Sequence, residues 1–227
     1  MYDPIDLAAL LDEMDTHGGV QRAIFLMDSL VKPSVTARKF VDAHPPDRFA
    51  LAMGGVNLLR PIPALRELAA IAADLPVVYA VVGPSFFWGD GQYPPSDAVY
   101  YPLYTKCAEL ELPLCVNTGL PGGPPIPGEV QNPIHLDRVC VRFPPELKLC
   151  MIHGADPWWD VAIRLLIKYE NLRLMTSHGR RNACRRACCT SCAPGGARTR
   201  SSSHLTSRCC GCSGWCPRPW PWTCLPT

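Results

Sequence analysis

Short apolar runs alternate with amphipathic segments along most of this 227-residue chain. The apolar runs, which we predict to be strands, cover residues 20–27, 49–56, 77–82, 114–116, 147–152 and 172–175. The amphipathic segments, which we predict to be helices, cover residues 5–14, 34–43, 62–73, 101–110, 133–143 and 157–169. Strands that are apolar throughout, instead of at every second residue, are typical of a parallel sheet covered by helices. The chain is therefore predicted to be an α/β protein.

Six helix–strand units predict an incomplete (β/α)8 TIM barrel, because a complete barrel needs about 250 residues. Asp3 is expected to cap the first helix, with Pro4 at its first position, and Ser34 to cap the second. An open doubly wound sheet is the alternative. It is less favoured, since no glycine-rich phosphate-binding motif follows any predicted strand.

Composition changes abruptly after Ser177. Residues 1–177 contain 14 Lys and Arg against all 20 Asp and Glu, a net charge of −6. Residues 178–227 contain eight Arg, no Lys and no acidic residue, and they hold nine of the 13 cysteines. No single fold explains both compositions. We therefore predict a barrel domain over residues 1–177 and a disordered, non-native Cys/Arg/Pro-rich tail over residues 178–227.

Overall charge and hydropathy exclude several classes of protein. A net charge of +2 does not suggest a nucleic-acid-binding protein. No apolar run approaches the roughly 18 residues that a membrane span needs, and no basic segment leads from Met1 into an apolar stretch. We expect a cytoplasmic protein that has a small-molecule substrate and that binds neither membranes nor nucleic acids.

The carboxyl ends of the strands are the expected site, because active sites of parallel barrels lie there. This rule selects Asp28, Trp88, Asn117, His153 and Ser177, together with the glycine- and proline-rich loop 119–128. His153 is the strongest candidate, since an imidazole at a barrel mouth can bind a metal or move a proton near neutral pH. Its alternative role is a half-buried histidine whose nitrogens are satisfied by the backbone.

The other candidates have structural alternatives as well. Asp28 is equally explained as a cap for the following turn, and Asn117 as the residue that closes a strand. Trp158 and Trp159 open a predicted helix, where packing is the expected role. The remaining histidines of the first region, which stand in helices or at helix ends, are expected at the surface: His17, His44 and His135.

Four segments resemble the amidohydrolase-related family, which includes enzymes of the aminocarboxymuconate-semialdehyde decarboxylase type. They are Tyr101–Leu110, Gln131–Arg138, His153–Trp159 and Tyr169–Leu172, with the pair Phe143-Pro144 as a further short match, and the resemblance extends from Asp3 to Ser177. It implies a metal-dependent (β/α)8 barrel that hydrolyses C–N or C–O bonds, or decarboxylates aromatic and enoic acids. In that family a divalent cation, usually zinc, is held by an H-x-H pair, a further His and an Asp. A His on the sixth strand, matched here by His153, assists proton transfer.

The chain departs from this pattern at every metal ligand. It contains no H-x-H, its fifth-strand ligand position is Asn117, and no acidic residue follows Glu170. An amide is a poor ligand for zinc. The family implies a divalent metal such as zinc, but we expect this chain not to bind it. The first strand is also expected to be missing, since the resemblance begins after it.

A shifted reading frame is our explanation for the tail. With GC-rich codons read one base earlier, His178–Arg186 becomes compatible with WAPKRMPA and Thr199–Ser207 with DKVIFASDF. Both strings resemble the family's sequence after its seventh strand. A zinc or disulfide module around Cys189-x-x-Cys192 is one alternative. An RNA-binding tail of Arg and Trp residues is another.

Two functions follow from these observations. The first is a metal-dependent hydrolase or decarboxylase of a small carboxylated or aromatic substrate, with His153 as acid and base, inactive in this chain. The second is a non-catalytic remnant without a metal site. In either case, unpaired edges of the strands at residues 20–27 and 172–175 are expected to favour self-association.

Overall fold

The computed structural model of this chain describes residues 6–18, 20–27, 33–85, 93–121, 127–143, 145–175 and 209–210. Seven parallel strands form one sheet whose spatial order is the order of the chain, β1 to β7. They are β1 (Ala23–Met27), β2 (Phe49–Met53), β3 (Val77–Val82), β4 (Leu114–Asn117), β5 (Leu149–Ile152), β6 (Leu172–Met175) and β7 (Cys209–Cys210). The predicted parallel α/β architecture is confirmed.

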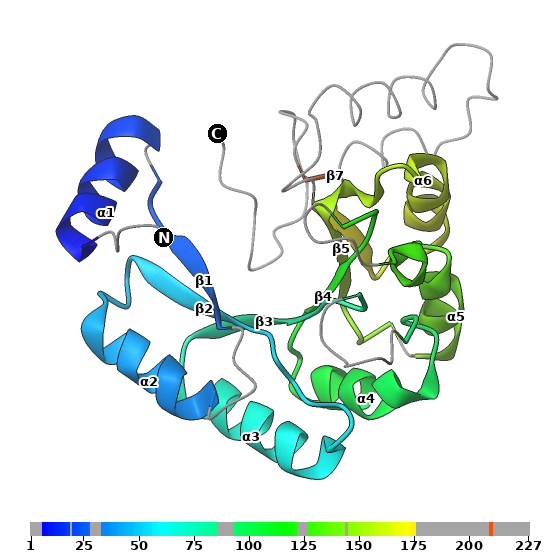
Figure 1. Ribbon diagram of the computed structural model, residues 1–227, viewed down its shortest axis with the longest axis horizontal. Coiled ribbons are helices and arrows are strands. Elements are labelled where there is room, and N and C mark those ends of the chain that lie inside the picture. Colours follow the sequence, from blue (N-terminus) through cyan, green and yellow to red (C-terminus); the bar gives the residue numbers. More distant parts are fainter. Residues whose placement is uncertain are drawn as a thin grey trace.

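Within the described residues, one α-helix connects each of the first five strands to the next. These helices are α2 (Pro33–Ala43), α3 (Pro61–Asp74), α4 (Tyr101–Glu109), α5 (His135–Arg142) and α6 (Trp159–Lys168). They line the outer side of a curved sheet, whereas α1 (Leu7–Glu13) lies beyond the β1 end of it (Figure 1). A curved, all-parallel sheet with helices outside is the arrangement of a partial TIM barrel.

Two separate groups of buried side chains lie on the two faces of the sheet. The outer core, between sheet and helices, contains alternate strand residues such as Leu114, Val116 and Leu149 together with helical residues such as Tyr104 and Leu136. The inner core is much smaller. Its fully buried members are Ala52, Val81, Cys115 and Ile152, with Tyr79, Cys150 and Met175 packed partly buried against them. Most of the apolar burial therefore lies outside the sheet, between strands and helices.

Several element boundaries differ from the predictions. Helix α1 begins at Leu7, and its cap is Asp6, whose carboxylate accepts a 2.8 Å hydrogen bond from the Ala9 amide. The predicted cap, Asp3, lies outside the described residues. Ser34 does not cap α2 but lies within it, because the helix already begins at Pro33. A proline fits that position well, since its missing N–H is not needed in the first turn.

The sixth strand does not present the unpaired edge that was expected of it. Leu174 and Met175 pair in parallel with Cys209 and Cys210 of β7. Two residues of the tail thus extend the sheet beyond β6. At the other end, β1 begins at Ala23 instead of Val20, and its side chains of Ile24 and Leu26 are 44% and 49% exposed.

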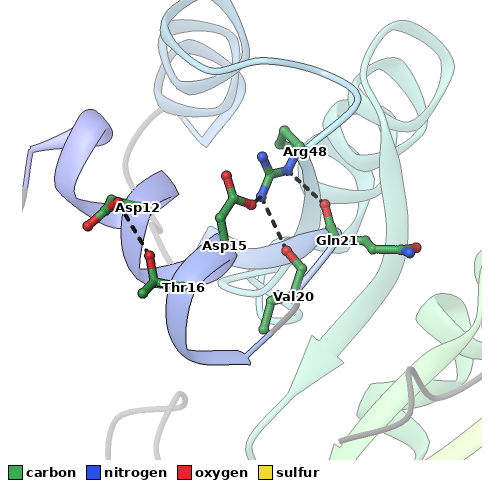
Figure 2. Close-up of polar contacts among 6 residues, drawn as sticks. All are labelled: Asp12, Asp15, Thr16, Val20, Gln21 and Arg48. Carbon is green, nitrogen blue, oxygen red and sulfur yellow. Dashed lines mark hydrogen bonds and ion pairs between the residues drawn. The ribbon is translucent and has the colours of Figure 1, made fainter.

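Arg48 fixes the chain that enters β1 to the start of β2 (Figure 2). Its guanidinium donates to the Gln21 carbonyl at 2.9 Å and the Val20 carbonyl at 3.2 Å, and it forms a 2.7 Å ion pair with Asp15. Asp15 lies in the π-helical turn Met14–Gly18 that follows α1. The side chain of Arg48, which directly precedes β2, thus joins this turn to the approach to β1.

Candidate functional site

Asn117 and His153 lie at the carboxyl ends of two neighbouring strands, β4 and β5. Asn117 is the last residue of β4 and is the register partner of Ile152, the last residue of β5. His153 follows directly and is half-buried. The strand alternation that turns Cys115 inward also places Asn117 on the inner face. The structure therefore brings together two of the five residues selected from the sequence.

The backbone after β5 is held in an unusual conformation. His153, Gly154 and Ala155 have φ angles of 71°, 76° and 60°, within the left-handed region. For residues with a side chain this region costs roughly 1–3 kcal/mol each and is concentrated at functional sites. The turn leads to Asp156 and the start of α6. His153 is therefore the first residue after the end of β5.

Glycine is required within this turn because the indole of Trp159 fills the adjoining space. A Cβ atom placed on Gly154 would lie 2.5 Å from Cη2 of Trp159. Trp159 is only 7% exposed and belongs to the outer core. The predicted packing role of this tryptophan is confirmed, and the same indole limits what can stand beside His153.

A network of hydrogen bonds links the ends of β4 and β5. The Thr118 amide and hydroxyl both donate to the Ile152 carbonyl, at 3.0 and 2.9 Å. The Gly119 amide donates to the Gln131 carbonyl at 3.1 Å, and Nε2 of Gln131 donates back to the Gly119 carbonyl at 2.8 Å. These hydrogen bonds fix the backbone next to Asn117 and His153 at the ends of β4 and β5.

Three buried polar atoms near these strand ends have no hydrogen-bond partner within the described residues. They are Oδ1 of Asn117, Oε1 of Gln131 and Nε1 of Trp159. Gln131 and Trp159 are 2% and 7% exposed. Sequence reasoning missed Gln131 because it precedes a predicted helix and ends no strand. The motif Gln131–Arg138 was noted only for its family resemblance.

The other predicted site residues divide into two groups. Asp28, Trp88 and Ser177 lie outside the described residues. The prediction that His44 and His135 are surface residues is wrong, since both are half-buried. His44 stacks on Phe40 with ring centroids 3.9 Å apart, and Nδ1 of His135 lies 3.4 Å from the Ser96 hydroxyl. Burial lowers the pKa of His135.

Two surface grooves lie elsewhere, beside α5 and α6. One, of about 500 Å³, is lined by Cys140, Phe143 and Tyr169 among others. The second, of about 420 Å³, lies between Ile134 and Arg164. Between them Asp137 accepts hydrogen bonds of 2.7 Å from both Lys168 and Tyr169. Neither groove is lined by Asn117 or His153. The candidate site at the strand ends is therefore defined by its residues and not by either groove.

The residues present do not fit a catalytic metal ion of the expected kind. Within the described ranges, no three His, Cys, Asp or Glu side chains are grouped so that they could hold a metal. The buried Oδ1 of Asn117 is a neutral amide oxygen, which suits harder ions and only as one ligand among several. The sequence supplies no H-x-H pair and no carboxylate after Glu170 to complete a set.

This chain belongs to the amidohydrolase family. The family model described as "Amidohydrolase" matches residues 36–200, which is well over half of the chain; the match begins within α2, includes α3 to β6 and continues beyond Ser177, where the sequence resemblance was expected to end. Among curated proteins, no sequence matches it. Within the described part, no helix is both long and apolar enough to cross a membrane.

Solved structures share the fold at low sequence identity. An uncharacterized TIM-barrel protein from Bordetella bronchiseptica superposes with a TM-score of 0.60 and 23% identity, over 76% of this chain and 60% of the other. The 2,6-dihydroxybenzoate decarboxylase from Rhizobium gives a TM-score of 0.59 and 20% identity, over 81% and 73%. A dihydroxybenzoic acid decarboxylase from Polaromonas sp. JS666, with bound manganese and the inhibitor 2-nitroresorcinol, gives 0.58 and 18%, over 81% and 71%. This chain thus spans 60% to 73% of these three structures.

Proposed function

We propose that the fold of this chain is that of a metal-dependent hydrolase or decarboxylase of a small carboxylated aromatic substrate. The observation that carries the proposal is the placement of His153 beside Asn117, at the strand ends where such barrels bind their substrates. Membership in the amidohydrolase family and the fold shared with two dihydroxybenzoate decarboxylases support this substrate class.

His153 is the residue that we assign to proton transfer. In a decarboxylation, the bond between ring carbon and carboxylate breaks, CO₂ leaves and the ring carbon takes a proton. In a hydrolysis, the leaving nitrogen or oxygen takes the proton. An imidazole is suited to either role near neutral pH, and the left-handed turn at residues 153–155 fixes its position. The Asn117 amide oxygen, buried at the end of the neighbouring strand, would accept a hydrogen bond from a substrate hydroxyl.

A second candidate function, a non-catalytic remnant, is favoured by the missing ligands. Asn117 stands where the family pattern has a metal-binding histidine, and the chain has neither the H-x-H pair nor the late aspartate. We propose that the present chain is inactive for this reason. We further propose that residues 178–227 are the family's C-terminal segment translated in a shifted frame, which removes that aspartate.

Metal content and CO₂ release distinguish the two functions. The purified chain is incubated with Mn²⁺ or Zn²⁺, desalted and assayed for bound metal and for decarboxylation of 2,6-dihydroxybenzoate. We expect no stoichiometric metal and no CO₂ above the buffer rate. A stoichiometric ion in the chain as it stands would refute the remnant.

Restoring the frame provides the matched control. A gene with one base restored near the Ser177 codon, and with the upstream sequence included, is expected to yield a protein that binds metal. Its turnover is expected to fall about 100-fold or more in the variant His153→Asn, as for loss of a general acid or base. Metal binding with unchanged turnover in that variant would remove His153 from the proposed role.

A further inference from the structure

Two cysteines occupy adjacent positions on the inner face of the sheet. Cys115 of β4 and Cys150 of β5 are partners in the parallel register. Both belong to the inner core, and both are thiols and not halves of a disulfide. Side chains of register partners in neighbouring strands project from the same face. The two sulfur atoms are therefore directed to the same side, next to each other.

The spacing of the strands suits a bond between these sulfurs. Neighbouring strands lie about 4.8 Å apart, which is within the Cα separation of about 4.4 to 6.8 Å found in disulfides, and a bond needs the two Cβ atoms to approach to about 3.5 to 4.5 Å. Two cysteines on helices provide a contrast. Cys107 lies on α4 and Cys140 on α5, both on helices at the outer side of the sheet. Neither has a cysteine as register partner.

A third side chain, that of Tyr79 on β3, lies in the same inner-face cluster as Cys115 and Cys150. It is packed against the inner core, and burial raises its pKa to about 12, with further contributions from Cys115 and Cys150. Access differs between the two cysteines: Cys115 is 3% exposed, whereas Cys150 is only partly buried. A reagent in solution thus reaches Cys150 first.

We propose that Cys115 and Cys150 form a redox-modifiable thiol pair, which a small disulfide of the glutathione type converts into a disulfide between β4 and β5. The Cys150 thiolate attacks one sulfur of the small disulfide, forming a mixed disulfide and releasing one small thiol. Cys115 then attacks the Cys150 sulfur and releases the second small thiol. The protein loses two electrons, the small disulfide gains two, and both protons leave with the released thiols.

The position of the pair gives this modification a structural consequence. Cys115 lies two residues before Asn117, and Cys150 lies three residues before His153. Oxidation would therefore link the two strands just below the rim that presents both side chains. The proposal itself does not depend on enzymatic activity, because its test is chemical.

Peptide mapping of the whole chain tests the proposal. The folded protein is incubated with oxidised glutathione, remaining thiols are alkylated, and the chain is digested with trypsin and a glutamyl endopeptidase. Glu109 and Glu111 lie between Cys107 and Cys115, so the double digest separates these two cysteines. We expect a cross-linked peptide pair joining Cys115 to Cys150, with Cys107 and Cys140 alkylated.

Two variants and a second reagent complete the test. In Cys115→Ser, Cys150 is expected to stop at the mixed disulfide with glutathione. In Cys150→Ser, Cys115 is expected to remain alkylatable. Phenylarsine oxide, which bridges adjacent thiols, is expected to protect both cysteines of the unaltered chain from alkylation. Full alkylation of both after either reagent, or a disulfide from Cys150 to a cysteine of the tail, would overturn the proposal.

Discussion

At Gly154 the absence of a side chain is needed twice, for the positive φ angle and for the indole of Trp159. The variant Gly154→Ala is expected to lower the free energy of unfolding by about 2 to 4 kcal/mol, from left-handed strain and overpacking together. Urea unfolding measures this loss. In the background Trp159→Phe, whose shorter ring leaves more room, the same change is expected to cost about 1 to 2 kcal/mol. An equal cost in both backgrounds would contradict the steric explanation.

At Asn117 a buried oxygen without a partner in the described structure makes the wild-type residue costly. Asn117→Leu, which branches at the same carbon, is expected to leave the free energy of unfolding unchanged or to raise it by about 1 kcal/mol. Asn132 is the matched control, because its Oδ1 accepts a 3.0 Å bond from the Ile134 amide. Asn132→Leu is expected to cost about 1 kcal/mol. A clear loss of stability on changing Asn117 would mean that its oxygen is bonded in solution.

Among the described residues of the site, the sequence predicted only those that directly follow an apolar strand. Asn117 and His153 follow apolar runs, so the barrel rule selects them. Gln131 was missed because its burial depends on hydrogen bonds with Gly119, which lies 12 residues earlier. The orphaned indole N–H of Trp159 was missed as well, since packing and hydrogen-bond satisfaction of one side chain cannot be separated in a sequence.

The contacts of Arg48 connect secondary-structure elements at the amino end of the sheet. Arg48→Ala removes three acceptor contacts of a guanidinium that is 23% exposed, and is expected to cost about 1 to 3 kcal/mol. Hydrogen exchange of the Val20 amide, which donates to Met14, is expected to accelerate at least about tenfold.

Arg38 provides the control for this prediction. Its ion pair with Asp74 has side chains 58% and 61% exposed, so that Arg38→Ala is expected to cost less than about 1 kcal/mol. Similar losses for the two arginines would show that the backbone contacts of Arg48 contribute nothing beyond a surface ion pair.

The contact between α5 and α6 predicts a pH dependence. Hydrogen bonds from Lys168 and then Tyr169 lower the pKa of Asp137. The folded-state pKa therefore lies below the unfolded value of about 3.9, and the stabilisation is present above that value and lost as the pH falls through the folded pKa. Asp137→Asn is expected to flatten the acid side of a stability–pH curve slightly, because the site is solvent-exposed.

Urea unfolding between pH 7 and pH 3 measures this curve. Asp42→Asn, at an exposed position near the end of α2, is the matched control. An identical acid slope for the unaltered chain and Asp137→Asn would contradict the assignment.

Element type was predictable here, whereas element ends were less so. β3 and β6 have the predicted bounds: β3 is a continuous apolar run between Pro76 and Gly83, and β6 is a short run between Asn171 and Thr176. The expected strand at residues 49–56 ends at Met53 instead, because its partner β1 ends at Met27, whose carbonyl accepts the last bond of the ladder from the Gly54 amide. Such long-range pairing has no local signal.

For the whole molecule, the open end of the sheet at β1 is the decisive feature. Ile24 and Leu26 are 44% and 49% exposed on the first strand in the spatial order. We expect the protein to elute from size exclusion with light scattering as a broad mixture of oligomers. Ile24→Lys is expected to shift this mixture toward monomer, because a charge at a strand edge opposes pairing between chains.

Leu59, which is 59% exposed in the loop after β2, serves as the control position. Leu59→Lys is expected to leave the distribution unchanged. A sharp monomer peak for the unaltered chain would contradict self-association through β1.

The order of the strands has a consequence for synthesis on the ribosome. Each strand from β2 to β6 pairs with the one made just before it, and the helix between them packs at once against both. Units can therefore be added in the order of translation, without waiting for distant parts of the message. An alteration of the message downstream of Ser177 then reaches a nascent chain whose earlier units have already assembled. A gene of this design can lose its chemistry at the 3′ end while still producing a folded body.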